Sequence, residues 1–347
     1  MLTTILATIF VLGVLIFFHE LGHFILAKRS GIRVEKFSLG FPPKLISKKW
    51  GETEYAIGII PLGGYVKMAG ENPEEGTKGE PWEFMAKPVW KRFLVIFAGP
   101  FMNFVLAVVV LAGLYFFRGK EADKVVIGRV NPDSPAALAG IKAGDTILSV
   151  DGIEINTFQE LANIVYKKVE MPVIISWSGD GVIRTDTMTT YKEVLLNGSG
   201  DSVAVGMIGI VSKYVYEKLG FFAAWSAGFR QSVYYVRMVF EFVWGLINRT
   251  ISTTEIGGPI FIGKLAGQTA SAGFDVLLEF LALLSVNLAV LNILPIPVFD
   301  GGHLLFLIIE KFKGSPLSIK ARLVAQQIGI AFLLILVIFV TFNDITR

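Results

Sequence analysis

The chain has 347 residues, of which 53% are hydrophobic and 18% are charged, and its mean hydropathy is +0.61. This composition excludes an ordinary soluble globular domain and favours a polytopic membrane protein. The 32 Lys and Arg residues barely outnumber the 29 Asp and Glu residues, so we attribute the basic excess to loops and expect no nucleic-acid partner. Cysteine is absent, which excludes disulfides, iron–sulfur centres, cysteine nucleophiles and thiolate metal ligands.

The first apolar stretch, residues 2–27, is long enough to cross a membrane, and Glu20 is its only charged residue. It lacks the basic start and the small-residue cleavage site of a signal peptide, so we expect it to remain as a helix. An ionised carboxylate near the centre of a spanning helix costs about 2.5–3.5 kcal/mol. We therefore expect a functional role for Glu20 that offsets this cost.

Glu20 lies inside an HExxH motif that also contains His19 and His23. Residues four apart emerge about 40° from each other on a helix, so the two imidazoles could hold one metal ion. Glu20 projects about 100° away from His19, which favours contact with a water on the metal over service as a third ligand. The alternative interpretation is that both histidines only hydrogen-bond to neighbouring helices.

Residues 28–92 contain twelve of the 32 Lys and Arg residues, so the positive-inside rule places this segment in the cytoplasm. Three further stretches have spanning length, which gives four predicted spans in total. The N-terminus and the region between the second and third spans then lie outside the cytoplasm. The second, third and fourth predicted spans are residues 93–117, 280–299 and 323–343.

A fifth apolar segment, residues 219–248, does not fit this count as a span. Its polar residues recur at three-, four- and seven-residue steps and form one stripe along an apolar helix, which is typical of a helix at the membrane surface. If it crossed, the two halves of the site described below would lie on opposite faces of the membrane. The stripe consists of Ser226, Arg230, Tyr234, Arg237, Glu241 and Asn248.

The region 118–212 has the texture of a small soluble α/β domain, with alternating strands such as 125–130 and 173–177. Its residues 130–152 closely resemble the bacterial PDZ pattern, in which a short helix and an AGxxxGD turn precede a strand. PDZ domains bind extended peptides or chain ends by strand addition. The alternative is a β-rich spacer that binds nothing.

The third predicted span ends in the motif NxxPxPxxDG, which begins at Asn292 and contains Asp300. Pro295 and Pro297 cannot continue a regular helix, and irregular backbone at membrane depth is tolerated only around a cavity or inside protein. Asp300 would supply the carboxylate that two histidines need for an open tetrahedral metal site. The alternative is that Asp300 only caps the helix that follows.

Taken together, these motifs resemble those of the site-2 protease family of intramembrane zinc metalloproteases, and in particular its bacterial regulator-of-sigma-E protease branch. The resemblance covers nearly the whole chain. Two departures are the single PDZ-like region, where longer relatives have two in tandem, and the Pro42-Pro43 pair. The supporting segments are HELGH at 19–23, PLGGYVKM at 61–68, AGP at 98–100 with Asn103, GGP at 257–259, NxxPxPxxDG at 292–301 and FND at 342–344.

The resemblance implies Zn²⁺ as the cofactor, with His19, His23 and Asp300 as its ligands. It implies Glu20 as the catalytic base and Asn292 as a group that holds the substrate backbone. The expected substrates are single-span membrane proteins, such as anti-sigma-factor-like regulators, or remnant signal peptides. The expected location is a bacterial inner membrane, with the active site toward the cytoplasm and the PDZ domain outside it.

Two rival functions remain open from the sequence. A catalytically silent PDZ adaptor or quality-control scaffold would lack a ligand or the base, and none is missing. A metal transporter would favour an inverted repeat, which is not evident.

The predicted fold is a four-helix polytopic membrane protein with an inserted α/β PDZ domain. It is divided as residues 1–27 (span 1), 28–92 (membrane-associated β/loop segment), 93–117 (span 2), 118–212 (PDZ domain), 213–275 (interfacial helix and linker), 276–303 (span 3), 304–322 (cytoplasmic loop) and 323–343 (span 4).

Overall fold

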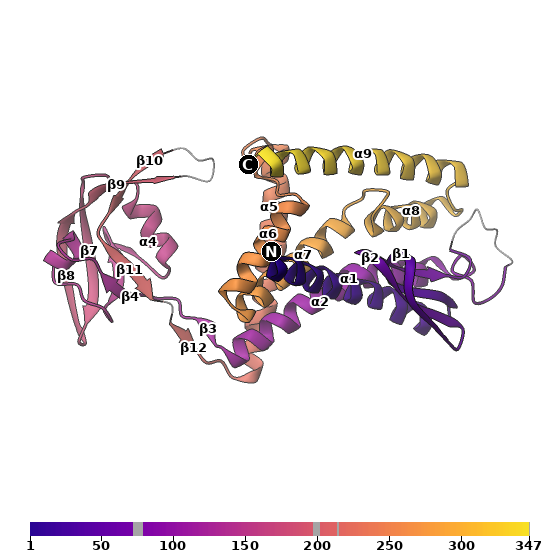
Figure 1. The fold of residues 1–347 in the computed structure, drawn as a ribbon, viewed down its shortest axis with the longest axis horizontal. Helices are drawn as coiled ribbons and strands as arrows, with labels where there is room; N and C mark the ends of the chain where they lie inside the picture. The colour runs from indigo at the N-terminus through magenta and orange to yellow at the C-terminus, as the bar shows by residue number, and fades with distance from the viewer. Residues whose placement is uncertain (72–78, 197–201, 214, 347) are drawn as a thin grey trace. The chain divides into compact units, whose positions relative to one another are not determined.

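The computed structural model describes residues 1–71, 79–196, 202–213 and 215–346 (Figure 1). Residues 72–78 of the predicted cytoplasmic segment and residues 197–201 of the predicted insert lie outside the described residues, as do residues 214 and 347. The chain forms two compact units. The first, called here the helical unit, comprises Met1–Phe117 and Gly220–Arg347, and the second, called the inserted domain, comprises Arg118–Leu219.

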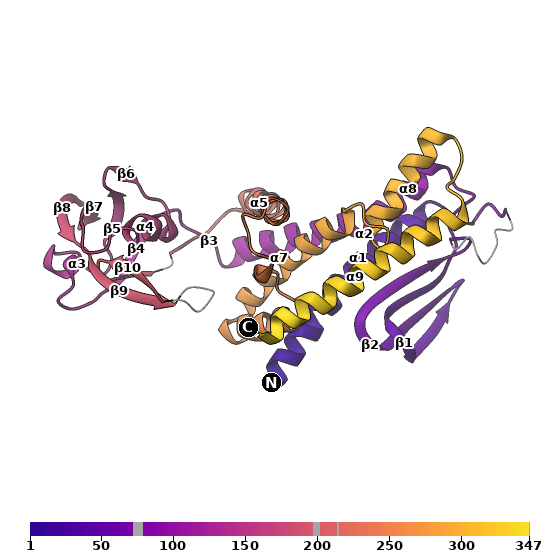
Figure 2. The same ribbon diagram turned by 90° about the horizontal axis from the view of Figure 1, so that it is seen from above.

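The helical unit contains four helices, within the described residues, that are long and apolar enough to span a membrane. They overlap the four predicted stretches, so the prediction of a four-helix polytopic membrane protein is confirmed. The third predicted span, 280–299, extends beyond its helix, which ends at Ile293. In Figures 1 and 2 both chain ends lie at the same end of the unit, as an even number of spans requires. The four helices are α1 (Leu2–Arg29), α2 (Val89–Phe117), α7 (Phe274–Ile293) and α9 (Ile319–Thr346).

Helices α1 and α2 pack closely because a glycine of each helix faces the backbone or the side chains of the other. A Cβ atom built on Gly22 of α1 would overlap the carbonyl of Ala98. A Cβ atom on Gly99 of α2 would overlap the imidazoles of His23 and His19. The motifs HELGH and AGP therefore fit together, and small residues permit this approach as they commonly do between membrane helices.

Helix α9 is the least enclosed of the four. Only 11% of its most apolar window is buried, compared with 44% for α2 and for α7. Its C-terminal end is fixed by Asp344, whose carboxylate accepts hydrogen bonds from the backbone N–H groups of Gly258 and Phe261 at 2.8 and 2.9 Å. These two donors lie at the start of α6 (Pro259–Ala272), where a carboxylate also complements the helix dipole.

Between α1 and α2 the chain forms a long antiparallel hairpin of β1 (Val34–Trp50) and β2 (Thr53–Met68) (Figure 2). Its register is repeatedly shifted by bulges, which twist a sheet. The root of the hairpin packs in a hydrophobic cluster with Phe37, Val66 and Val95. Strand β2 is thereby held beside α1 along the stretch that carries the HExxH motif.

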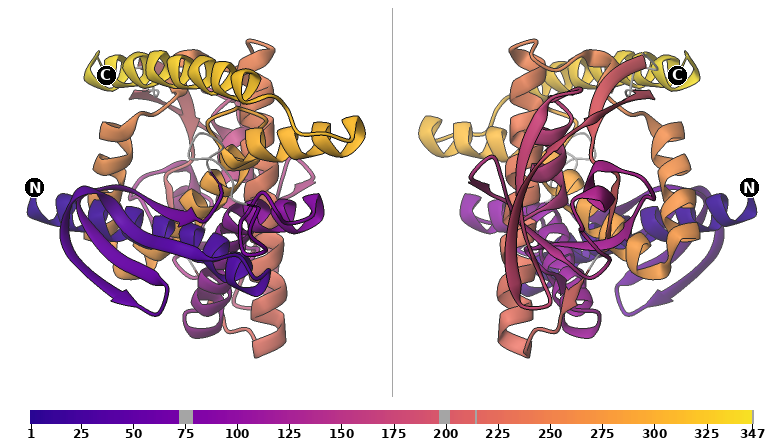
Figure 3. Two further views of the ribbon diagram at one scale, coloured as in Figure 1. Left: turned by 90° about the vertical axis from the view of Figure 1, so that its right-hand side faces the viewer. Right: turned by 90° about the vertical axis from the view of Figure 1, so that its left-hand side faces the viewer.

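Helix α5 (Phe221–Ile247) runs across α1 and α9 rather than alongside them (Figures 1 and 3). It packs on α2 through Gly228, whose absent Cβ leaves room for the backbone of Ala112. Arg237 and Glu241 form an exposed ion pair at 2.6 Å. This orientation is the one expected of the predicted interfacial helix, whose position in a membrane stays a prediction.

The segment 304–322, which we expected to be a loop, begins inside a helix, α8 (Asp300–Lys313). The prolines end α7, but the extended residue Phe299 lets a new helix start at once. Leu304 and Leu307 bury one face of α8, and Gly314, with φ +78°, ends it. The sequence argument stopped at the helix break and did not consider a restart.

The inserted domain is built on a six-stranded sheet of order β11-β4-β5-β7-β8, with β6 paired to β5. Its core contains the fully buried Trp177, Ile127 and Ile175. A capping box between Thr157 and Glu160 starts the longer of its two helices. The elements are β3 (Lys120–Glu121), β4 (Val125–Val130), α3 (Pro135–Leu138), β5 (Thr146–Val150), β6 (Ile153–Glu154), α4 (Phe158–Val165), β7 (Pro172–Gly179), β8 (Val182–Thr189), β9 (Tyr191–Leu196), β10 (Ser202–Met207), β11 (Ile210–Lys213) and β12 (Tyr216–Glu217).

Candidate metal centre

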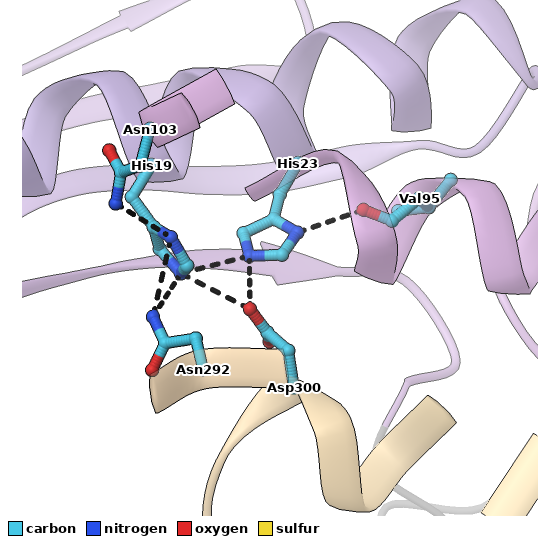
Figure 4. Close-up of polar contacts among 6 residues, drawn as sticks. All are labelled: His19, His23, Val95, Asn103, Asn292 and Asp300. Carbon is cyan, nitrogen blue, oxygen red and sulfur yellow. Dashed lines mark hydrogen bonds and ion pairs between the residues drawn. The ribbon is translucent and has the colours of Figure 1, made fainter. Parts of the chain in front are cut away.

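Three side chains from two distant parts of the chain converge inside the helical unit (Figure 4). His19 and His23 project from one face of α1, and Asp300 is the first residue of α8. The Oδ2 atom of Asp300 lies 3.3 Å from Nε2 of His19 and 3.4 Å from Nε2 of His23, and the two Nε2 atoms are 3.3 Å apart. The structure thus brings the two sequence-predicted halves of the site together.

The donor set fits a metal ion better than it fits an internal hydrogen-bond network. Oδ2 of Asp300 is buried and makes no hydrogen bond, although two imidazole nitrogens lie near it. Ligand atoms of the three residues all lie within 4.8 Å of one another, so one cation could contact all three. Two imidazole nitrogens and one carboxylate oxygen, with room for a fourth group, are typical of catalytic zinc sites.

His23 is held in the orientation that a metal ligand needs. Its Nδ1 lies 2.8 Å from the carbonyl oxygen of Val95 on α2, and a carbonyl can only accept, so Nδ1 carries the proton (Figure 4). The lone pair then resides on Nε2, the atom that faces Asp300. Such an outer hydrogen bond fixes the tautomer of a ligating histidine.

His19 is flanked by two amides. Nδ2 of Asn103 lies 3.5 Å from Nδ1 of His19, and Nδ2 of Asn292 lies 3.5 Å from both ring nitrogens. Oδ1 of Asn103 is buried without a hydrogen-bond partner. Rotating this amide by half a turn brings its oxygen to Nδ1 of His19, which completes the same outer arrangement that Val95 gives His23.

The local backbone explains why Asp300 sits where it does. A Cβ atom on Gly301 would overlap the carbonyls of Ile293 and Leu294, so only glycine lets the unwound segment fold over the start of α8. Asp300 follows the N-cap residue Phe299, and no side chain caps this helix. The alternative interpretation, in which Asp300 acts only as a helix cap, is therefore wrong.

A cavity of about 520 Å³ opens at the three residues. Glu20 lines it together with His19, His23 and Asp300, and Gly64 of β2 leaves space for Glu20, because a Cβ there would lie 3.1 Å from Cγ of Glu20. His303, one helical turn beyond Asp300, also faces the cavity. Glu20 and the three candidate ligands therefore line one cavity.

Several residues of this region were missed by sequence reasoning. Glu71 lines the cavity, and burial raises its pKa to about 7, against the hydrogen bond that it accepts from the backbone N–H of Met68. Arg92 and Arg322 line it as well. No motif spacing marks these residues, because folding alone brings them to the cavity.

A polytopic helical protein with this ligand set and a neighbouring glutamate has the architecture of a membrane metallopeptidase. The profile of Peptidase family M50 matches residues 7–336, and the chain belongs to this family, that of the site-2 proteases. A Rhizobium meliloti protein, placed provisionally among the zinc metalloproteases by its name, is 34% identical over 99% of this chain and 96% of that protein. The regulator of sigma-W protease RasP of Bacillus subtilis is 30% identical over 99% of this chain and 98% of RasP. The predictions of the site-2 protease family and of a zinc metalloendopeptidase are confirmed.

Two of the solved structures that the chain is similar to are PDZ domains, and each similarity covers about a quarter of this chain. The PDZ domain of an SdrC-like protein from Listeria monocytogenes is 25% identical, covers 26% of this chain and 87% of that domain, and has a TM-score of 0.22. Its counterpart from Listeria innocua is 26% identical, covers 27% of this chain and 98% of that domain, and has the same TM-score.

Proposed function

We propose that the protein is a zinc-dependent endopeptidase that cleaves the membrane-spanning segments of other proteins. His19, His23 and Asp300 hold the zinc ion, and Glu20 is the catalytic base. The observation that carries this proposal is the convergence of three ligand atoms within 4.8 Å, with Oδ2 of Asp300 buried and free of hydrogen bonds. A bound zinc ion supplies a Lewis acid that activates water and polarises the scissile carbonyl.

The chain's own residues carry the proton and hold the reactants. The carboxylate of Glu20 faces the cavity beside the ligand set, where it takes a proton from the attacking water and delivers it to the leaving amine. The Val95 carbonyl keeps the lone pair of His23 directed at the site. Asn292 holds the substrate backbone in this proposal, which its position at the end of α7, 3.5 Å from His19, supports. Hydrolysis then needs no other titrating side chain.

The depth of the motif supports cleavage within the membrane. His19 precedes Lys28 by nine residues on one helix, which places the site roughly 13 Å below the cytoplasmic border at about 1.5 Å per residue. A helical substrate must unwind locally to reach it. Single-span proteins and remnant signal peptides, which carry one such helix, are the substrates we propose.

Removal of single groups tests the assignment. Glu20→Gln should retain about one zinc per chain and lose cleavage, whereas His19→Ala combined with His23→Ala should lose the metal. Glu241→Gln, which neutralises an exposed carboxylate on α5, is the matched control and should change neither. Zinc content measured by elemental analysis decides the ligand set: metal retained by the doubly substituted protein would contradict it. Membrane peptides that accumulate with the Glu20→Gln variant, identified by mass spectrometry, would name the substrates.

The sidedness proposed from the basic residues puts the metal centre toward the cytoplasm and the inserted domain outside it. Cysteine labelling is direct in this cysteine-free chain. Probes introduced at Lys218 and Asn248, which bracket α5, should both react from outside. A probe at Asn248 that reacted only from the cytoplasm would show that α5 spans the membrane and that the proposed topology is wrong.

We propose that the inserted domain, which resembles PDZ domains, screens substrates by binding a short external chain end along a strand. It contains no histidine, and the three candidate ligands all belong to the helical unit. Replacing residues 124–211 with a flexible bridge should preserve zinc binding and the cleavage of substrates that have already lost their external domain. The altered protein should also cleave substrates whose external domains are intact. Continued rejection of those substrates by a folded, zinc-loaded protein would assign the screening elsewhere. A silent adaptor, the alternative function, would cleave nothing in this assay.

A further inference from the structure

Two arginines line the cavity of the candidate metal centre, Arg92 from α2 and Arg322 from α9, and Glu310 of α8 lies between them. Nη1 and Nη2 of Arg92 donate to the two carboxylate oxygens of Glu310 at 3.1 and 2.6 Å. Nη2 of Arg322 is 3.7 Å from Oε2 of the same carboxylate. Two cations thus face one anion, and the cluster retains one positive charge.

Arg92 and Glu310 satisfy each other. Their side chains are 5% and 8% exposed, and their pairing is the planar two-bond arrangement that guanidinium and carboxylate groups favour. The remaining Nε–H of Arg92 donates to the carbonyl of Lys87 at 2.9 Å. This pair is a completed structural link between α2 and α8.

Arg322 has no such partner. Its side chain is only 17% exposed, yet it makes no hydrogen bond to any part of the chain that the structure describes, and its Nε is buried without a partner. A guanidinium carries five N–H donors, and leaving a buried donor such as Nε of Arg322 without a partner is costly. The carboxylate nearest to it is already occupied by Arg92. Arg322 therefore has the features of a group that binds an anion from outside the chain.

The face of α9 that carries Arg322 is turned toward the cavity. Three further residues of α9 line the same space. They are Ile319, three residues before Arg322, and Leu323 and Gln326, one and four residues after it. Lys320, on the other side of the helix, is exposed. An anion bound to Arg322 within this space would therefore share the cavity with the candidate metal centre, where we expect the substrate to bind.

We infer that Arg322 binds a carboxylate of the substrate, so that the enzyme favours membrane segments with an Asp or Glu side chain at one position beside the scissile bond. This inference rests on the proposed function. A single carboxylate neutralises the positive charge that the cluster retains, and it fits the planar fork of a guanidinium. A substrate chain that reaches the metal centre fills this cavity, whereas a lipid phosphate held there would compete with it.

A stability measurement separates a binding role from a structural one. In the substrate-free, zinc-loaded protein, Arg322→Met removes a largely buried charge that makes no hydrogen bond, and it should raise the melting temperature by about 2–4 °C. Arg92→Met, which leaves Glu310 without its hydrogen bonds, should lower it. A fall for Arg322→Met of the size seen for Arg92→Met would show that Arg322 is a structural partner of Glu310, and would overturn the inference.

Cleavage of synthetic single-span peptides tests the ligand. Each peptide carries Asp or the isosteric Asn at one position, and the position is moved stepwise through the flank of the scissile bond. At one position Asp should lower KM at least about tenfold relative to Asn for the wild type, with kcat little changed. Arg322→Gln should abolish that preference, and the exposed control Lys320→Gln should keep it.

Three results would count against the inference. Equal KM values for every Asp and Asn pair would show that no substrate carboxylate is read. A preference that survives in Arg322→Gln would place the reader elsewhere. Phosphatidylglycerol bound to purified wild-type protein but not to Arg322→Gln, seen by native mass spectrometry together with equal KM values, would assign the site to a lipid phosphate. A zinc-loaded protein that cleaved none of these peptides would instead contradict the proposed function.

Discussion

A buried carboxylate of the inserted domain and one of the helical unit make contacts of opposite kinds. In the inserted domain, Asp145 completes structure nearby in the sequence, because it accepts a hydrogen bond from the backbone of Lys142 at 2.9 Å. In the helical unit, Glu310 joins distant segments, because it accepts hydrogen bonds from Arg92 across 218 positions. Polar groups in an apolar interior are expensive, so those that link distant helices mark where function is concentrated.

The strongest test of this contrast replaces one aspartate of each unit by alanine, in two separate variants. Asp300→Ala should weaken zinc binding by more than about 100-fold and abolish cleavage, because loss of a ligand exceeds the 10–100-fold effect typical of outer-shell changes. The inserted domain should stay folded. Asp145→Ala should do the reverse and destabilise the inserted domain by about 1–3 kcal/mol without affecting zinc. Elemental analysis and hydrogen exchange of each unit measure both, and zinc loss in Asp145→Ala would break the contrast.

Packing around the metal centre provides the next test. Gly99→Ala places a methyl group where the imidazoles of His23 and His19 lie, so it should displace the ligands and cost about 1–3 kcal/mol of stability. Gly113→Ala is the matched control on the same helix, because nothing lies within 4 Å of its Cβ position. Alanine should be neutral or slightly stabilising there. Equal zinc content and equal thermal stability in the two variants would show that the close approach of α1 and α2 is not needed for the site.

The ease of prediction from sequence follows the same division between local and distant contacts. His19, Glu20 and His23 share one helix, so their spacing alone predicted their grouping, and the Pro295-Pro297 pair predicted the break before Asp300. Apolar length predicted the four spans. Arg322 and Glu71 carry no such signal, since only the packing of α8, α9 and β2 brings them to the cavity. The start of the new helix α8 was missed because the two prolines indicate where a helix ends and do not indicate where the following helix begins.

A smaller effect is expected from the amide beside His19. Asn103→Ala removes the outer partner of Nδ1 and should weaken zinc binding by about tenfold, at the low end of outer-shell effects. Ser285→Ala is the control, because it removes the 2.7 Å hydrogen bond to the backbone carbonyl of Asn103 and leaves the amide in place. Competition with a chelator of known affinity measures both. Unchanged affinity in Asn103→Ala would mean that His19 is oriented by Asn292 alone.

The smallest effect belongs to a turn of the inserted domain. The carboxylate of Asp151 pairs with Lys168 at 2.6 Å and accepts the backbone N–H of Ile174 at 3.0 Å. The Lys168 ammonium, and then that N–H, hold the pKa of Asp151 below its ordinary value. A carboxylate with a lowered folded pKa stabilises the fold at pH values above its unfolded pKa of about 4, and this contribution is lost as pH falls through the lower folded pKa.

Asp151→Asn should therefore destabilise the inserted domain by about 1 kcal/mol at neutral pH, because the site is partly exposed and its ion pair is screened. Asparagine accepts the left-handed backbone at this position, φ +52°, so the change removes charge without adding strain. Asp180→Asn is the control at a second left-handed turn, φ +53°, for which the described residues show no ion pair. Hydrogen exchange of the strand that contains Ile174, followed from pH 7 down to about pH 3, should show the Asp151→Asn difference shrinking as acid protonates the wild-type carboxylate. A difference that stayed constant over this range would mean that side-chain shape, and not charge, stabilises the turn.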